Sequence, residues 1–119
     1  ACFVVVGRID VPFDSIQTLK NALSHLGKPY DYYYLPDDKE IYCSELVQIS
    51  YVTEDGKLIF STIPMTFRNR EGEIPEFWVK HYAKKGIAIP EGEPGTNPGE
   101  LSRRKEIKII GRLVVPKQR

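Results

Sequence analysis

The stretch that decides the fold of this chain is Ile41-Tyr42-Cys43-Ser44-Glu45-Leu46-Val47. It places one cysteine where a β-favouring segment gives way to apolar residues at helical spacing, and it predicts a helix from about 43 to 51. The first N–H groups of a helix lack backbone partners and the helix dipole is positive there, which favours a thiolate over a thiol. The stretch therefore indicates a reactive cysteine at a helix start. A buried structural thiol is the alternative that it leaves open.

Upstream of this stretch the sequence predicts one strand and one helix. Residues 3–9 are rich in valine and are typical of a buried strand. Asp14 or Ser15 can cap the helix that follows, and Gly27 at the C′ position, with Pro29 behind it, should end that helix. Four apolar residues recur within it at helical spacing: Ile16, Leu19, Leu23 and Leu26.

Downstream of the stretch we expect a third helix and a second strand. Pro75 opens the helix and Gly86 ends it. Its core-facing residues are expected to be Phe77, Trp78 and Tyr82. Residues 63–74 and 90–99 are predicted to be loops, and the last strand spans residues 107–115. This order of elements predicts an α+β fold with few strands.

The composition is typical of a globular protein with one domain over residues 1–119. The formal net charge of +1 gives no general attraction to nucleic acid, so we expect no nucleic-acid partner. No apolar run reaches membrane-spanning length. The chain opens directly on strand-like residues, and its two clearest strands lie at its ends. We therefore expect a processed or truncated piece whose antiparallel sheet is incomplete without upstream material.

The chain holds two cysteines and two histidines. Cys2 and Cys43 occur in unlike contexts, so we expect two separate thiols, with Cys2 a small buried residue. A cysteine nucleophile usually needs a histidine base. His25 is expected to interact with the end of its helix and His81 to lie on a solvated helix surface, so neither is an evident partner for Cys43. We expect no metal site and no cofactor, because a zinc site needs more ligands at closer spacing.

A loop rich in tyrosine and aspartate, residues 30–38, closely precedes the cysteine. Tyrosine offers a flat apolar face with a polar tip, which suits the wall of a cleft. Asp31 and Asp38 could bind an amine or orient their neighbours. In the alternative interpretation the tyrosines pack against the core and the acidic residues form turns.

Two motifs in combination resemble the YiiX-like family, which are circularly permuted papain-like amidases related to the NlpC-type cell-wall hydrolases. The motifs are Leu26-Gly27-Lys28-Pro29-Tyr30-Asp31 and the opening stretch from Ile41 to Val47. Further similarity around residues 64–67, 75–82 and 89–95 extends the resemblance from about Phe3 to Leu113. The resemblance implies the C-terminal half of a permuted papain-like domain, with helices packed on an antiparallel sheet.

By this resemblance Cys43 is the nucleophile at the start of the papain-type helix, Tyr42 lines the active site, and Tyr30 and Asp31 bind substrate at the cleft mouth. The implied reaction is hydrolysis of an amide, as in a cell-wall peptide, or of an acyl-lipid bond, through a thioester. The family's catalytic histidine precedes the cysteine, so an upstream segment or a second chain must supply it. A location in the bacterial periplasm or cell envelope is a family-level expectation.

Two other functions remain open at this point. A non-catalytic module that keeps the cleft would bind a peptide or a lipid, and a buried, inert Cys43 would favour it. An inactive half-domain lacking its catalytic histidine would instead complete the sheet of another chain, and folding that depends on protein concentration would favour that function.

Overall fold

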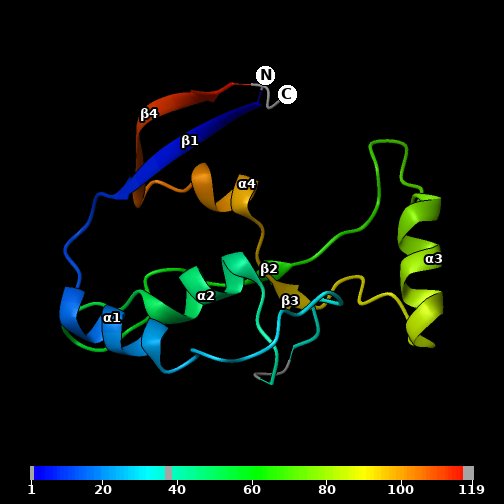
Figure 1. The fold of residues 1–119 in the computed structure, drawn as a ribbon, viewed down its shortest axis with the longest axis horizontal. Coiled ribbons are helices and arrows are strands. Elements are labelled where there is room, and N and C mark those ends of the chain that lie inside the picture. The colour runs from blue at the N-terminus through cyan, green and yellow to red at the C-terminus, as the bar shows by residue number, and fades with distance from the viewer. Residues whose placement is uncertain (1, 37–38, 117–119) are drawn as a thin grey trace.

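The computed structural model describes residues 2–36 and 39–116. Its elements in chain order are β1 (Cys2–Ile9), α1 (Ser15–Leu23), α2 (Cys43–Ser50), β2 (Ile63–Pro64), α3 (Glu76–Lys85), β3 (Pro94–Gly95), α4 (Pro98–Ser102) and β4 (Ile107–Val115). Helices occur together with two small antiparallel sheets, which confirms the α+β class. In Figure 1 the sheet of β1 and β4 lies above α1, α2 and α4, and α3 stands at the opposite end of the molecule.

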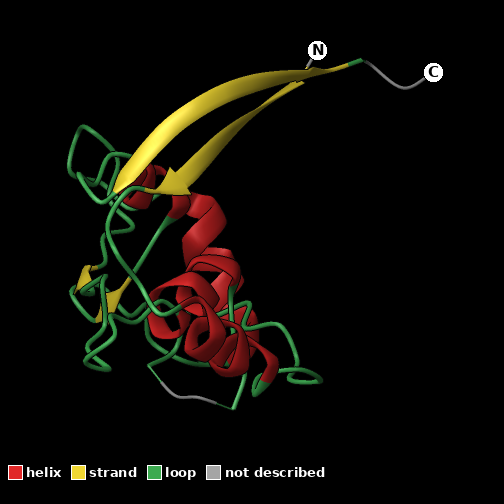
Figure 2. Ribbon diagram, turned by 90° about the vertical axis from the view of Figure 1, so that its left-hand side faces the viewer, coloured by secondary structure: helices red, strands yellow, loops and turns green. Residues whose placement is uncertain are grey.

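The two strands predicted near the ends of the chain pair with each other. β1 and β4 run antiparallel along their lengths, with a β-bulge between Val6 and Gly7. Glycine is favoured at the bulge because a Cβ on Gly7 would lie 2.8 Å from the Ile107 side chain. Within the described residues each strand has one partner, so the outer edge of each is free. In Figure 2 this sheet arches away from the helices toward the chain ends.

Helix α1 begins where it is predicted to begin but ends earlier. Asp14 is the N-cap, and its carboxylate accepts a hydrogen bond from a first-turn N–H at 2.9 Å. The prediction that the helix continues to Gly27 is wrong, because it ends at Leu23. The N–H groups of His25 and Leu26 bond to carbonyls three residues back, which tightens this segment into turns.

Helices α2 and α3 begin and end close to their predicted bounds. Gly86 ends α3 in the left-handed conformation, with φ 73°. Tyr82 is buried as predicted, but the prediction for Phe77 is wrong: it packs at the surface on Trp78 and His81 and is 67% exposed. No helix in the described ranges is long and apolar enough to cross a bilayer.

A cluster of rings forms the aromatic core, which we define as Tyr34, Tyr42, Phe67, Trp78 and Tyr82. Neighbouring ring centroids in this cluster lie 5.0 to 6.5 Å apart. Most of the pairs meet edge to face, the arrangement that aromatic quadrupoles favour. The aromatic core joins the tyrosine-rich loop, α2 and α3, and it thereby holds together the segments around Cys43.

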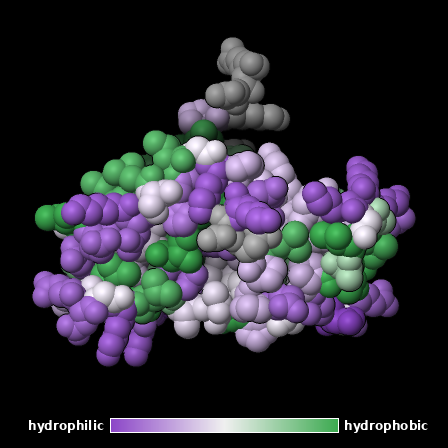
Figure 3. Space-filling view, turned by 90° about the horizontal axis from the view of Figure 1, so that it is seen from below, coloured by the Kyte–Doolittle hydropathy of each residue, from purple (hydrophilic) through white to green (hydrophobic). Residues whose placement is uncertain are grey.

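Most apolar residues of β1, α1 and β4 are exposed, in contrast to the aromatic core. We call the exposed apolar residues of these elements that do not line the cavity beside Cys43 the open face: Phe3, Val4, Ile16, Leu19, Leu23, Leu113, Val114 and Val115. An apolar stripe normally faces the interior, yet Leu19 is 60% exposed. Figure 3 shows hydrophobic surface toward both ends of the molecule, where α1 and α3 lie in Figure 1. The radius of gyration is 16.3 Å, against about 13.5 Å for a compact domain of this length.

Candidate active site

Cys43 is the first residue of α2, and its side chain is exposed and free. Tyr42 precedes the helix as its N-cap, and its carbonyl accepts the first helical hydrogen bond from Leu46 at 3.1 Å. The Glu45 carboxylate accepts from the Tyr42 N–H at 3.4 Å, which strengthens this helix start. The alternative of a buried structural thiol is therefore wrong for Cys43. The thiol lies where unpaired helix N–H groups can act on it.

The other cysteine gives a natural comparison for Cys43. Cys2 is also free, so the prediction of two separate thiols is confirmed. The prediction that Cys2 is buried is wrong, because β1 belongs to the open face and its side chains are exposed. The chain thus presents two accessible thiols, and Cys43 is the one at a helix start.

The tyrosine-rich loop runs directly alongside the segment that leads into α2. A parallel bridge pairs Tyr30 with Ile41, and the Asp31 N–H donates to the Ile41 carbonyl at 3.0 Å. This pairing brings the Tyr30 phenol to Cys43. Burial raises the pKa of Tyr30, and the nearby charge and side chain of Cys43 raise it further. The phenol therefore keeps its proton at neutral pH and can donate it in a hydrogen bond toward the sulfur.

Tyr30 and Tyr32 form an exposed aromatic pair beside the thiol. Their ring centroids are 4.9 Å apart, and the two residues are 42% and 63% exposed. Flat, accessible rings of this kind can contact an apolar or amide-containing ligand. That Tyr30 lies at the mouth of a cleft and binds substrate stays a prediction.

Asp31 is placed differently from its neighbour, because its side chain is only 1% exposed. Carboxylate oxygen Oδ1 accepts from the Tyr33 N–H at 3.0 Å, and Oδ2 is buried with no hydrogen-bond partner. In this arrangement the carboxylate holds the loop rather than facing solvent. A substrate contact by Asp31 stays a prediction, and Asp38 lies outside the described residues.

Unlike Tyr30 and Tyr32, Tyr82 is buried, and Tyr34 is half-buried. Burial raises the pKa of Tyr82, and the charges of Tyr34, Asp31 and Tyr33 add to that increase. Its hydroxyl donates to the Tyr33 carbonyl at 2.9 Å. Burial likewise raises the pKa of Tyr34, with a further contribution from Cys43. The aromatic core therefore stays neutral across the physiological pH range.

Tyr42 and Ser44, the two residues that flank Cys43, are both 4% exposed. The Tyr42 hydroxyl accepts from the Thr96 N–H at 3.1 Å, and the Thr96 hydroxyl donates to Ser44 Oγ at 3.0 Å. Tyr42 is thus buried and bonded to Thr96, and its expected role in lining the active site stays a prediction. The sequence offered no local signal for Thr96, which lies 54 residues from Tyr42.

The two histidines contact other groups. The ring nitrogen Nδ1 of His25 lies 3.0 Å from Lys28 Nζ, just beyond the end of α1. His81 Nε2 lies 2.6 Å from the Tyr32 carbonyl, and its ring stacks on Tyr33 at 4.7 Å. His81 is half-buried and its contact with the Tyr32 carbonyl is exposed, so it lies at the helix surface as expected, with the Tyr33 ring stacked on it. Within the described residues neither histidine bonds to Cys43, so the usual base for a cysteine nucleophile is not in place.

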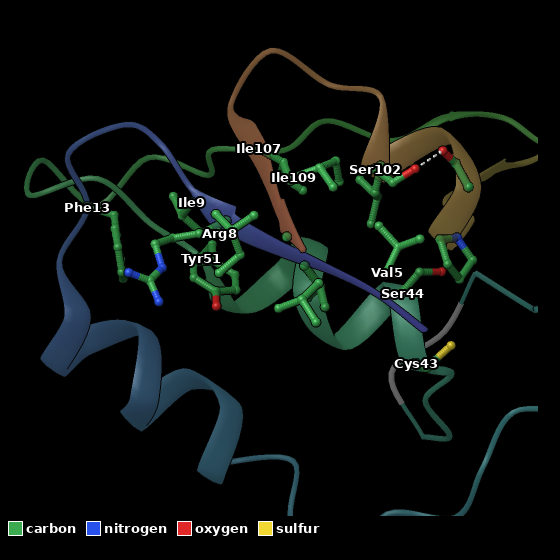
Figure 4. A pocket seen from close by; sticks show the side chains of 17 residues that line it. Val5, Arg8, Ile9, Phe13, Cys43, Ser44, Tyr51, Ser102, Ile107 and Ile109 are labelled. Atoms are coloured by element: carbon green, nitrogen blue, oxygen red, sulfur yellow. Dashed lines mark hydrogen bonds between the residues drawn. The ribbon is translucent and has the colours of Figure 1, made fainter. Parts of the chain in front are cut away.

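An apolar cavity of about 900 Å³ adjoins the thiol. It lies between the β1/β4 sheet and helices α2 and α4, and Figure 4 shows Cys43 and Ser44 at one end and Phe13 and Arg8 at the other. Its lining includes Val5, Ile9, Val47, Leu101, Ile107 and Ile109. The volume is within the range of ligand pockets. The arrangement can therefore admit an apolar group next to an accessible thiol.

Comparison with known proteins gives one family match. The model of the permuted papain-like amidase enzymes, the YaeF/YiiX or C92 family, matches residues 4–111. No curated protein and no solved structure matches the chain.

Proposed function

Because this chain belongs to the YaeF/YiiX family of permuted papain-like amidases, we propose that Cys43 is the nucleophile of a cysteine hydrolase. The observation that carries the proposal is an exposed, free thiol at the first position of α2, next to the Tyr30 phenol. A helix start supplies N–H groups for a thiolate and for an oxyanion alike. Cys2, by contrast, lies on strand β1 and not at the start of a helix.

The proposed chemistry is acyl transfer to sulfur. A histidine from outside the described residues takes the thiol proton, and the sulfur attacks the carbonyl carbon of an amide or ester. The carbonyl oxygen becomes an oxyanion, to which the Cys43 N–H can donate. The C–N or C–O bond then breaks, the leaving group takes the proton, and a thioester remains. Water attacks the thioester and releases the acid and the free thiol.

The substrate that we propose is a peptide amide or an acyl-lipid bond. The exposed pair Tyr30 and Tyr32 lies near the thiol, and Cys43 also borders the apolar cavity. Both surfaces favour a substrate with an apolar group next to the scissile carbonyl. No metal or organic cofactor is needed for this reaction.

We further propose that a strand-bearing segment covers the open face and supplies the histidine. The chain exposes 8887 Å², whereas a compact monomer of its mass exposes about 6,600 Å². The difference, roughly 2,300 Å², is what one side of a large obligate interface buries. The free edges of β1 and β4 are templates for further strands. The segment lies either upstream in a longer form of the chain or on a second chain.

The first test is alkylation of the protein by iodoacetamide, with each cysteine followed by peptide mass spectrometry. We expect Cys43 to react at least tenfold faster than Cys2 at pH 6, on the order of the effect that a helix start has on a thiol. Both thiols are exposed, so Cys2 is an internal control for access. Equal, slow reaction of the two would contradict the proposal and favour a non-catalytic binding module.

The second test supplies the missing base chemically. Free imidazole is added to the protein with an acyl p-nitrophenyl ester, and the rate is compared with that of Cys43→Ser. The wild-type protein should exceed the variant, because only the thiol can form the thioester. The variant corrects for direct hydrolysis by imidazole. Activity that is identical in the two proteins would remove Cys43 from the mechanism.

A further inference from the structure

Thr96 bonds to both neighbours of Cys43 but not to Cys43 itself. Its backbone N–H donates to the Tyr42 hydroxyl at 3.1 Å, and its hydroxyl donates to Ser44 Oγ at 3.0 Å. All three residues are less than 8% exposed. Hydrogen bonds in such a shielded place are not in competition with water, so they hold their geometry well. One residue thereby connects the N-cap of α2 to the second residue of the helix.

The position of Thr96 is itself firmly set. On one side, β3 pairs with β2, and the Met65 N–H donates to the Glu93 carbonyl at 2.8 Å. On the other side, Asn97 caps α4 by accepting from the Glu100 N–H at 2.7 Å. Thr96 is the single residue between these two anchors. Because both anchors restrict its movement, its hydrogen bonds can in turn restrict the movement of the first residues of α2.

The chain packs closely at this point. Gly95, next to Thr96, is buried, and a Cβ there would lie 2.4 Å from Met65 Sδ and 3.0 Å from the Tyr42 hydroxyl. The absence of a side chain lets the β3 backbone approach the Tyr42 hydroxyl. This approach is what brings the Thr96 N–H within hydrogen-bond distance of Tyr42.

We propose that Thr96 is a positioning residue for the Cys43 thiol, because it fixes the residues on both sides of the thiol and so holds the sulfur at the N-terminus of α2. The inference rests on the assignment of Cys43 as the nucleophile. It adds a residue from the distant β3–α4 connection to the machinery of the site. Its effect is on the reactivity of the thiol, which can be measured without a substrate or the missing histidine.

The test is the pH profile of Cys43 alkylation by iodoacetamide in the wild-type protein, Thr96→Val and Thr96→Ser. Thr96→Val keeps the shape of the side chain and removes the hydroxyl. We expect it to slow alkylation at pH 6 by about threefold to tenfold, the range that follows from the loss of one hydrogen bond. The difference should vanish above about pH 10, where an ordinary thiol is ionised. Thr96→Ser restores the hydroxyl and should restore the wild-type profile.

Thr18→Val is the matched control. Thr18 is 8% exposed, and its hydroxyl accepts from the Val52 N–H at 3.4 Å, so the variant also loses one buried threonine hydrogen bond. It should leave the Cys43 profile unchanged. An equal effect of Thr18→Val, or slowing by Thr96→Val that is the same at every pH, would overturn the proposal. Cys2 in the same protein reports general changes in access. The rate of Cys43 relative to Cys2 in the wild-type protein tests the proposed hydrolase, whereas the rate of Cys43 in Thr96→Val relative to the wild-type protein tests the role of Thr96. The two proposals can therefore fail separately.

A second variant covers the case in which Thr96→Val does not fold, as judged by circular dichroism. Ser44→Ala removes the acceptor of the same hydrogen bond from the α2 side. It should slow Cys43 alkylation at pH 6 as Thr96→Val does. A wild-type pH profile in a folded Ser44→Ala protein would overturn the proposal by itself.

Discussion

The aromatic core and the open face differ in how far their side chains are shielded from water. Tyr82 of the aromatic core is 1% exposed, whereas Leu19 of the open face is 60% exposed. Buried tyrosines carry a polar tip that finds a partner nearby, as the Tyr82 hydroxyl does at the Tyr33 carbonyl. The aliphatic side chains of β1, α1 and β4 need an extended complementary surface instead. The residues packed around Cys43 thus form a buried cluster, whereas many apolar side chains of β1, α1 and β4 are exposed.

The largest expected effect comes from breaking the aromatic core. Phe67 is 7% exposed, and its ring lies 5.1 Å from Trp78 and 5.6 Å from Tyr82. Phe67→Ala should lower the free energy of unfolding by about 3 to 5 kcal/mol, because it leaves a cavity. Urea denaturation followed by circular dichroism measures the change.

Phe3→Ala on the open face is the matched control for that prediction. Phe3 is 56% exposed and contacts the Arg112 guanidinium at 4.2 Å from the ring centroid. Its removal should lower the free energy of unfolding by less than about 1 kcal/mol. Equal losses in the two variants would mean that the aromatic core contributes no more to stability than the open face does.

A double substitution on the open face should change the free energy of unfolding less than Phe67→Ala does, and it should mainly reduce association between copies of the protein. Leu19→Gln combined with Leu23→Gln should change the free energy of unfolding by less than about 0.5 kcal/mol per site, since both side chains are exposed. The double variant should bind less of a hydrophobic dye and self-associate less in analytical ultracentrifugation. Strong destabilisation would show that α1 already packs on a partner surface within this chain.

The smallest expected effect concerns acid stability of the loop that carries Phe67. The Phe67 N–H and then the Thr66 hydroxyl hold the pKa of Glu91 below its ordinary value of 4.5, with a further contribution from Arg68. A lowered pKa in the folded state gives stability that is present above the unfolded pKa and is lost as pH falls through the folded pKa. Glu91→Gln should therefore lose less stability than the wild-type protein as pH falls below about 4.5.

Thermal unfolding between pH 3 and pH 6 measures this difference. Glu93→Gln is the control, because the Glu93 side chain has no hydrogen-bond partner or ion pair within the described residues. It should follow the wild-type curve. If Glu91→Gln also follows it, the Glu91 carboxylate does not tether the Phe67 loop to the rest of the aromatic core.

The sequence predicted the ends of elements well where a single residue sets the backbone. Asp14 caps α1, and Gly86 ends α3 with a positive φ, because capping and glycine conformations are properties of a few adjacent residues. The end of α1 was mispredicted at Gly27, since turns with bonds to carbonyls three residues back compete with the last helical turn. The two-residue strands β2 and β3 are too short to leave a hydrophobic period.

Burial was the property that sequence patterns predicted least well. Phe77 and Cys2 were expected inside, and both are exposed. A pattern indicates which residues share a face, but it does not say whether another element covers that face. For the same reason, the helical spacing of the four apolar residues of the α1 segment did not indicate that they are exposed.

Local sequence patterns were enough to predict the longer elements in order, the resemblance to permuted papain-like amidases and the place of Cys43 at the start of α2, but not β2, β3 or α4. These features depend on motifs and on interactions a few residues apart. The packing of distant elements, by contrast, bonds Thr96 to Tyr42 and Ser44 on either side of the thiol and leaves most apolar residues of β1, α1 and β4 exposed. The reason is that contacts between residues more than 50 positions apart follow from how whole elements pack, which no local stretch specifies.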